Sequence, residues 1–307
     1  MLVHVGFFNW VQFSNEPCDV GDGLRGVCFT SAECSLYAGR VLGSCAQGYG
    51  VCCQVARTCG QTITFNNSYF VDPTWIGGTV PNGGHCSVVV RTGTHVRVCQ
   101  LKLDLERFDI VGPDVFGHSG GCTHDSFAVT GQDSNGAVPV ICGVNHGQHM
   151  YVSVTQSAGP VQLSVSLAPN VTQRTWKIRV IQIPCGSPRL APTGCLQYQE
   201  KPSGLVSSFN YDADSRPEGG YPNHLRYSVC FRKAHGTCTV RFSKQGPFGV
   251  GARPRGAPDE VLINRCQNFE LGSPAQSDFL LLGVQPYCGD DFPPYIETGM
   301  YKALCEP

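Results

Sequence analysis

The stretch that decides the fold is CTHDSFAVTGQDSNGAVPVICG, residues 122–143. A cysteine is followed by an aspartate, an alternating strand-like run and a closing Cys-Gly pair. Residues 266–289 repeat this order, with Asp278-Phe279 after Cys266 and Cys288-Gly289 at the end. A cysteine-bracketed strand that occurs twice indicates two related modules.

All 18 cysteines fall into three successive sets of six. The sets are Cys18, Cys28, Cys34, Cys45, Cys52 and Cys53; Cys59, Cys86, Cys99, Cys122, Cys142 and Cys185; and Cys195, Cys230, Cys238, Cys266, Cys288 and Cys305. Even sets of this kind indicate disulfides within modules, and disulfides persist in oxidising compartments. The chain is therefore expected to be secreted and extracellular.

Composition narrows the class of protein. With 37 glycines, 21 prolines and 15% charged residues, the chain is expected to be rich in turns and β-structure. A net charge of −1 implies no general attraction to nucleic acid or anionic lipid. No apolar run approaches the roughly 18 residues that a membrane span requires.

Alternation of apolar and polar residues predicts strands after residue 60. The clearest runs are Leu101–Leu105, Met150–Val154, Val161–Leu167 and Trp176–Val180. A period of two marks half-buried strands, and strands without intervening helices favour an antiparallel sandwich.

The first cysteine set lies in residues 18–53, which are too few to bury much core without cross-links. A zinc site is disfavoured, because the segment has no C-x2-C pair and no histidine. Its spacing, C-x9-C-x5-C-x10-C-x6-CC, resembles the clip module of arthropod proteins. That resemblance implies the pairs Cys18–Cys52, Cys28–Cys45 and Cys34–Cys53.

The repeated segment of residues 122–143 resembles the second disulfide hairpin of CUB domains, and the Cys59–Cys86 interval resembles the first. Longer strings in residues 10–54, 138–152 and 183–198 look like a family of secreted arthropod CUB proteins. The resemblance covers nearly the whole chain. It implies an all-β protein with two CUB-like antiparallel β-sandwiches preceded by a small disulfide-knotted, clip-like module. The expected boundaries are a lead segment at 1–16, the clip-like module at 17–55 and CUB-like domains at 57–185 and 186–307.

The CUB resemblance also implies disulfide pairs in the two larger modules. They are Cys59–Cys86, Cys122–Cys142, Cys195–Cys230 and Cys266–Cys288. Four cysteines are left over, and we favour Cys99 with Cys185 and Cys238 with Cys305. The pair Cys185–Cys195 is the competing choice.

Both ends of the chain depart from expectation. Residues 1–13 lack the basic start and small-residue cleavage site of a signal peptide. Either a signal sequence precedes them or the chain is not secreted, and the cysteines favour the first. After Cys288, residues 295–301 show no clean alternation, so the second sandwich is expected to lack its final strands. Sequons at Asn66 and Asn170 predict glycosylation.

Two patterns suggest catalysis and are explained better without it. Residues 117–121 match the G-x-S-x-G nucleophile elbow at Ser119, but a β segment follows where that motif needs a helix. Four histidines could hold zinc if loops converged, yet none are spaced for one helix face. They are His118, His124, His146 and His149. A glycine-rich loop and surface or turn histidines are the expected roles.

Calcium is the one cofactor that the resemblance raises, because some CUB domains bind it through a Glu and two Asp. Asp125 and Asp278 match the acidic position after the third cysteine of each module. Glu106, Asp109 and Asp114 could contribute further oxygens to the first site. Calcium takes six to eight oxygens, and residues 155–157 supply no carboxylate. Asp125 is therefore the candidate ligand, and a solvated or hairpin-capping aspartate is the alternative.

The favoured function is non-enzymatic extracellular recognition or adhesion, with a protein or a glycan as ligand. The alternative is a regulator of an extracellular clip-type serine protease cascade, in defence or development, without a protease domain of its own. A hydrolase using Ser119 or a histidine-bound metal is the third hypothesis. Ligand identity and oligomeric state do not follow from the sequence.

Overall fold

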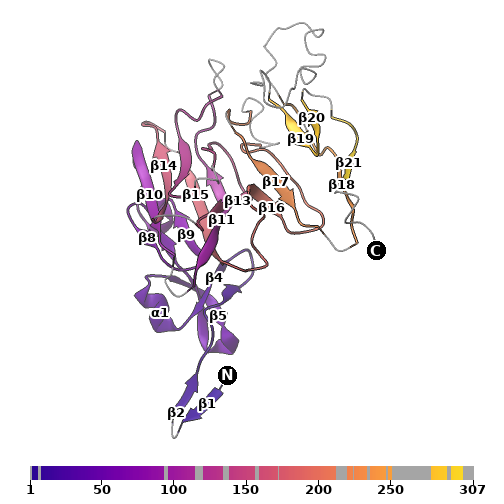
Figure 1. The fold of residues 1–307 in the computed structure, drawn as a ribbon. Helices are drawn as coiled ribbons and strands as arrows, with labels where there is room; N and C mark the ends of the chain where they lie inside the picture. The colour runs from indigo at the N-terminus through magenta and orange to yellow at the C-terminus, as the bar shows by residue number, and fades with distance from the viewer. Residues whose placement is uncertain are drawn as a thin grey trace, which may run out of the picture. The chain divides into compact units, whose positions relative to one another are not determined.

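A computed structural model describes most of the chain (Figure 1). The described residues are 2–5, 8–92, 96–114, 120–133, 138–155, 159–171, 173–211, 220–223, 225–233, 236–246, 248–250, 278–288 and 292–299. The chain divides into two compact units, residues 1–231 and 232–307. The protein is nearly all β, and the described part holds one short α-helix. None of its described helices is long and apolar enough to cross a membrane.

The first unit begins with a hairpin of β1 (Leu2–Val5) and β2 (Phe8–Val11). A small four-stranded sheet follows it. Its order is β3-β4-β6-β5. The elements are β3 (Pro17–Asp19), β4 (Arg25–Phe29), α1 (Ser31–Leu36), β5 (Arg40–Cys45), η1 (Ala46–Gly48) and β6 (Gly50–Gln54). Helix α1 starts with a capping box, in which Thr30 and Glu33 each bond the other's backbone N–H.

Three disulfides hold this module: Cys18–Cys52, Cys28–Cys45 and Cys34–Cys53. They coincide with the pairs that the clip resemblance implies. Gly39 passes so close to the Cys34–Cys53 bridge that a Cβ atom there would overlap the Cys53 sulfur. The identification with the clip family itself stays a prediction.

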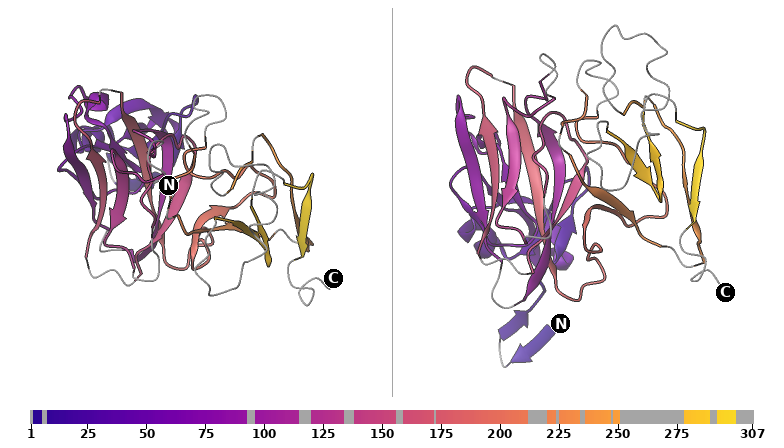
Figure 2. Two further views of the ribbon diagram at one scale, coloured as in Figure 1. Left: turned by 90° about the horizontal axis from the view of Figure 1, so that it is seen from above. Right: turned by 45° about the horizontal axis from the view of Figure 1, so that its top comes forward.

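Two sheets packed face to face form the sandwich (Figure 2). One has the order β12-β14-β10-β8 and the other β13-β11-β15-β9-β7. The strands are β7 (Ala56–Arg57), β8 (Thr62–Ile63), β9 (Ser68–Val71), β10 (Gly84–Val90), β11 (Val98–Asp109), β12 (Ser126–Thr130), β13 (His149–Ser153), β14 (Val161–Leu167) and β15 (Thr175–Pro184). The all-β prediction is confirmed, and the four alternating runs predicted after residue 60 form β11, β13, β14 and β15.

The inward side chains of both sheets make one continuous core. Leu103 of β11 and Ile178 of β15 come from one sheet, and Val88 of β10 and Leu163 of β14 from the other. Three disulfides brace the sandwich: Cys59–Cys86, Cys99–Cys185 and Cys122–Cys142. Cys99–Cys185 joins the first residues of β11 to the end of β15, and is the pairing favoured over Cys185–Cys195.

The outer face of β15 is also buried. The alternating sequence predicted that only one face of this strand is buried. Tyr151, Ile181 and Ile183 project outward and are buried in a second cluster with Ala191 and Cys195. The covering segment, residues 190–199, ends with β16 (Cys195–Gln199). Strand β16 pairs in parallel with β17 (Ser228–Phe231) and is bridged to it by Cys195–Cys230. The strand is thus buried on both faces because a later part of the chain lies on it.

The second unit contains two described pairs of strands. One joins β18 (Thr239–Phe242) to β21 (Ile296–Gly299), and the other joins β19 (Leu280–Leu282) to β20 (Gln285–Tyr287). Residues 296–299 form a strand although their sequence shows no alternation, because four residues are too few to display a period. Cys238 and Cys288 are both in disulfides. Cys266 and Cys305 lie outside the described residues, so these two pairings and the domain boundaries stay predictions.

Replacing Cys99 and Cys185 together by alanine should destabilise the first unit more than replacing Cys59 and Cys86. The bridges span 86 and 27 residues, and loop-closure entropy gives about 4.5 and about 3.5 kcal/mol. Denaturant unfolding of both double variants measures this. A larger loss from the shorter loop would contradict the role given to Cys99–Cys185.

Candidate functional site

Asp125 forms a fully buried ion pair with Arg174 at one end of the sandwich. Arg174 Nε lies 2.6 Å from Asp125 Oδ2, and its Nη2 lies 2.7 Å from Oδ1. The side chains are 1% and 0% exposed. Asp125 also accepts hydrogen bonds from the backbone N–H of Val111, at 3.0 Å, and Ala168, at 2.9 Å. One carboxylate therefore ties together the segments that follow β11 and β14 and precede β15.

This environment decides the charge of Asp125. Burial alone raises the pKa of its carboxyl group, but the bonds from Arg174, Ala168 and Val111 outweigh burial and lower the pKa below its usual value. Arg174 neutralises the resulting carboxylate, and each carboxylate oxygen accepts one bond from Arg174 and one from a backbone N–H. Asp125 is placed as a structural, loop-fastening residue with no open side for a calcium ion.

Two of the other acidic candidates of the sandwich have partners of their own, and the third, Asp109, is the last residue of β11. Glu106 pairs with Lys177, Oε2 to Nζ 2.9 Å, and Asp114 bonds His124. Asp278 belongs to the second unit. Among the described residues, no three or more His, Cys, Asp or Glu side chains lie together as a metal site.

Three of the four candidate histidines are described, and each has its own environment. His146 Nδ1 accepts the backbone N–H of Phe108 at 2.9 Å. His149 Nε2 lies 3.1 Å from both the N and O atoms of Tyr198, on the covering segment. His124 is exposed and bonds Asp114. His118 lies outside the described residues.

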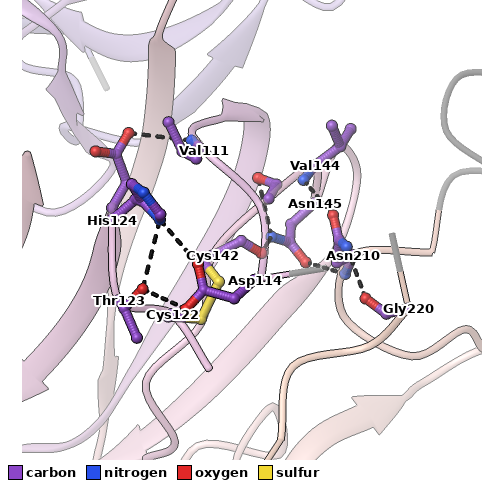
Figure 3. The surroundings of a disulfide bond; sticks show 12 residues. Val111, Asp114, Cys122, Thr123, His124, Cys142, Val144, Asn145, Asn210 and Gly220 are labelled. Atoms are coloured by element: carbon purple, nitrogen blue, oxygen red, sulfur yellow. Dashed lines mark hydrogen bonds and ion pairs between the residues drawn. A yellow bond between two sulfur atoms is a disulfide. The ribbon is translucent and has the colours of Figure 1, made fainter. Parts of the chain in front are cut away.

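Figure 3 shows Asp114, Thr123 and His124 beside the Cys122–Cys142 disulfide. His124 Nδ1 is 2.9 Å from Asp114 Oδ1, and the Thr123 hydroxyl donates to the other Asp114 oxygen. The Thr123 hydroxyl also lies 3.4 Å from His124 Nδ1, the nitrogen that Asp114 bonds. An aspartate–histidine pair can orient a base, but a nucleophile would have to sit at Nε2. Ser119 lies outside the described residues, so no catalytic constellation is assembled within them.

Asn210 follows the covering segment in the chain and bonds Val144 and Asn145 on the other side of the same disulfide (Figure 3). Its Oδ1 accepts the Val144 N–H at 3.0 Å, and its Nδ2 donates to the Gly220 carbonyl at 2.8 Å. Its own N–H bonds Asn145 Oδ1 at 2.8 Å. A Cβ atom at Gly143 would overlap the Asn210 side chain, so only glycine allows this approach.

A β-bulge in β11 lies beside a groove that the sequence analysis missed. Leu105 pairs with Ile178 and Arg107 pairs with Lys177, so Glu106 is an extra residue in the strand. The inward series of Leu105 resumes at Phe108. Glu106 and Arg107 therefore both face outward, and bulges commonly redirect side chains in this way. Two adjacent polar residues within a strictly alternating run are the signal that could have revealed it.

The groove has a volume of about 380 Å³ and lies where the first module meets the sandwich. It is lined by Gly23, Arg25, Trp75, Glu106, Arg107 and Lys177. Trp75 belongs to η2 (Pro73–Ile76) and is 44% exposed. Lys177 Nζ lies 5.5 Å from the centre of the Trp75 ring and 4.7 Å from that of Tyr69. The groove thus combines cations, one carboxylate and a half-exposed indole.

Tyr69 fixes the two sides of this groove. Its hydroxyl lies 3.2 Å from the Arg25 carbonyl oxygen and 3.2 Å from Glu106 Oε1. Burial, reinforced by the Glu106 carboxylate, raises the pKa of Tyr69, so it stays a neutral donor. The first module is therefore anchored to the sandwich at the groove itself.

The two predicted glycosylation sites are exposed. Asn66 Oδ1 accepts backbone N–H groups from Asn67, at 2.9 Å, and Gln182, at 2.8 Å. Asn170 occupies a turn with φ of 62°. In both cases the side chain lies at the surface, as modification requires.

Comparison with known proteins gives one family match. Residues 192–303, less than half of the chain, match the model of the animal CUB domain. This match extends over both compact units, because it begins at residue 192 and the first unit ends at residue 231. Its first residues include most of the covering segment. No curated protein matches.

Solved structures give weak likenesses. The full extracellular region of zebrafish Gpr126/Adgrg6 is 15% identical, with a TM-score of 0.32, over 42% of this chain and 15% of that one. The CUB1-EGF-CUB2 domains of rat MASP-1 are 14% identical, at 0.30, over 42% of each chain. The Ca²⁺-bound MASP-1 CUB2 domain is 16% identical, at 0.30, over 40% of this chain and 98% of that one. The chain thus spans well under two thirds of the first two, and likenesses at these TM-scores carry no functional argument.

Replacing Arg174 by methionine should cost about 3–5 kcal/mol of unfolding free energy, because it leaves a buried carboxylate without its partner. Adding Asp125→Asn to that variant should restore part of the loss, since asparagine keeps an acceptor without the charge. Arg25→Met, which breaks an exposed pair with Asp19, should change stability little. Equal losses of unfolding free energy for Arg174→Met and Arg25→Met would contradict the stabilising role of the Asp125–Arg174 ion pair. Denaturant unfolding measures both.

The first unit should lose stability as the pH falls below about 6.5, the usual histidine pKa. Burial, with a contribution from Lys102, lowers the pKa of His149 in the folded protein. The unfolded chain then binds the proton first, so the free energy of unfolding decreases with decreasing pH. His149→Gln should flatten this dependence between pH 7.5 and 5.5, whereas His124→Gln at the exposed histidine should keep it.

Proposed function

We propose that the protein is a non-enzymatic extracellular recognition protein that binds its ligand through CUB-like modules. One observation carries the proposal: residues 192–303 match the animal CUB domain model. Seven disulfides between described cysteines support an oxidising, extracellular location. Binding to another protein or to a glycan is the activity that a rigid, cross-linked β-scaffold serves.

The chemistry of the described residues supports a binding role over a catalytic one. Asp125 is neutralised by Arg174, and the three candidate histidines within the described residues have separate partners. Secretion would expose Asn66 and Asn170 to the glycosylation machinery, and we include N-glycans at both in the proposal.

Regulation of a clip-type protease cascade is the second candidate. It is favoured by the first module, whose three bridges pair first with fifth, second with fourth and third with sixth cysteines. These are the pairs that the clip resemblance implies. In this role the chain would modulate a protease that it does not itself contain.

The two candidates predict different results when purified full-length protein is added to extracellular fluid. A recognition protein should bind a partner saturably and leave cascade protease activity within about twofold of buffer. A regulator should change the rate of protease activation in proportion to the amount added. The absence of saturable binding to any partner would contradict the leading proposal.

Ser119→Ala and a serine-directed fluorophosphonate probe test the hydrolase hypothesis in the same preparation. We expect no labelling of the wild-type chain and unchanged partner binding by the variant, because the described residues that follow Ser119 form strand β12 where a nucleophile elbow needs a helix. Stoichiometric labelling that disappears in Ser119→Ala would contradict the non-enzymatic assignment.

A further inference from the structure

The groove between the first module and the sandwich carries more positive than negative charge. Arg25, Arg107 and Lys177 line it, with Glu106 as the single carboxylate. Glu106 neutralises Lys177 at 2.9 Å, and Asp19 accompanies Arg25 at 3.2 Å. Within the described part of the chain, no ion pair involves Arg107. One guanidinium is therefore left to bind an anion.

The bulge places this cation at an unfavourable position for the free protein. Arg107 pairs directly with Lys177 across the β11–β15 ladder, and Glu106 balances only one of these two positive charges. Like charges directly opposite one another destabilise a sheet. Arg107 is exposed, so its planar fork of donors is accessible. A ligand carboxylate or sulfate would relieve the repulsion and accept two hydrogen bonds from the guanidinium.

Two further features narrow the chemistry of the ligand. Trp75 offers a half-exposed, flat apolar ring beside Lys177. The Glu106 carboxylate also lines the groove. It repels a simple anion but accepts hydrogen bonds from hydroxyl groups, so it favours a ligand that carries them. The ligand must therefore combine an acidic group, hydroxyl groups and a flat apolar face.

An extended peptide fits the groove poorly. β11 is hydrogen-bonded on both sides, to β13 and β15, and β15 is bonded to β11 and β9. Neither strand has a free backbone edge here for a peptide to join. The volume of about 380 Å³ is at the lower end of small-molecule sites, which span about 300–1,000 Å³. A compact ring read by side chains suits such a site.

We propose that this groove binds an acidic sugar ring of an oligosaccharide. The carboxylate or sulfate pairs with Arg107, the ring packs against Trp75, and a hydroxyl donates to Glu106. This inference rests on the proposed recognition function and names the ligand class for one site. Carboxylated and sulfated sugars share the chemistry, and the experiment separates them.

Calorimetric titration of the full chain at physiological ionic strength tests the assignment with four probes. They are a sulfated heparin hexasaccharide, a carboxylated hyaluronan hexasaccharide, neutral maltohexaose and hexaglutamate. At least one acidic hexasaccharide should bind. Because heparin also carries carboxylates, binding of heparin alone would identify the sulfate, and binding of hyaluronan would show that a carboxylate suffices. Maltohexaose and hexaglutamate should bind at least about tenfold more weakly, because each lacks part of the required chemistry.

Arg107→Gln and Trp75→Ala should each weaken binding about tenfold or more, the effect of losing a charge-assisted hydrogen bond or an aromatic anchor. Arg91→Gln, at an exposed arginine outside the groove, should change affinity less than about twofold. Arg107→Lys keeps the charge without the fork and should give an intermediate loss. It serves as the groove variant if Arg107→Gln or Trp75→Ala fails to show the wild-type melting temperature.

Three results would overturn the assignment: neither acidic hexasaccharide binds, the groove variants bind as the wild type does, or hexaglutamate binds as tightly as the sugars. If the groove variants still bind a partner from extracellular fluid, the recognition function stands and only the groove assignment fails. Loss of all binding by the wild type would defeat both.

Discussion

The antiparallel ladder of β11 and β15 is the constraint on which the rest of the first unit depends. Cys99–Cys185 closes one end of it, and the Asp125–Arg174 pair fastens the other. Between these ends, the inward side chains form half of the sandwich core. The outward side chains face the first module and the covering segment. A covalent bond and a buried ion pair thus hold one ladder whose two faces both carry contacts.

Fixing this ladder has a functional consequence on its outer face. The bulge at Glu106 turns Arg107 outward opposite Lys177, and Tyr69 holds the first module against the same place. The ladder holds the backbone positions of both cations, because it is fastened at both ends. A preorganised site loses less conformational freedom on binding, so rigidity in the scaffold favours recognition at the groove.

Much of the fold follows from local pattern. Each described disulfide joins two cysteines of one predicted set, and the alternation of Leu101–Leu105 marks the face of β11 that enters the core. The burial of Ile181 and Ile183 could not be predicted in this way. It depends on residues 190–199 lying across β15, which is a tertiary contact and leaves no period in the strand.

The candidate site was predictable in part and for physical reasons. The position of Asp125 beside Cys122 marks it as special, but its partner Arg174 is 49 residues away. Whether a carboxylate meets a cation or a metal depends on that partner, and spacing does not reveal it. The groove depends in turn on a one-residue bulge, which moves Arg107 from the expected core side to the surface.

Hydrogen–deuterium exchange of the full chain, with and without a saturating acidic hexasaccharide, tests the central claim most directly. The claim is that recognition occurs where the first module meets the outer face of the β11–β15 ladder. Added protection is predicted in the turn at 21–25 and in the segment at 73–77, which border the groove. Protection confined to the opposite end of the ladder, around Cys99–Cys185, would contradict the account.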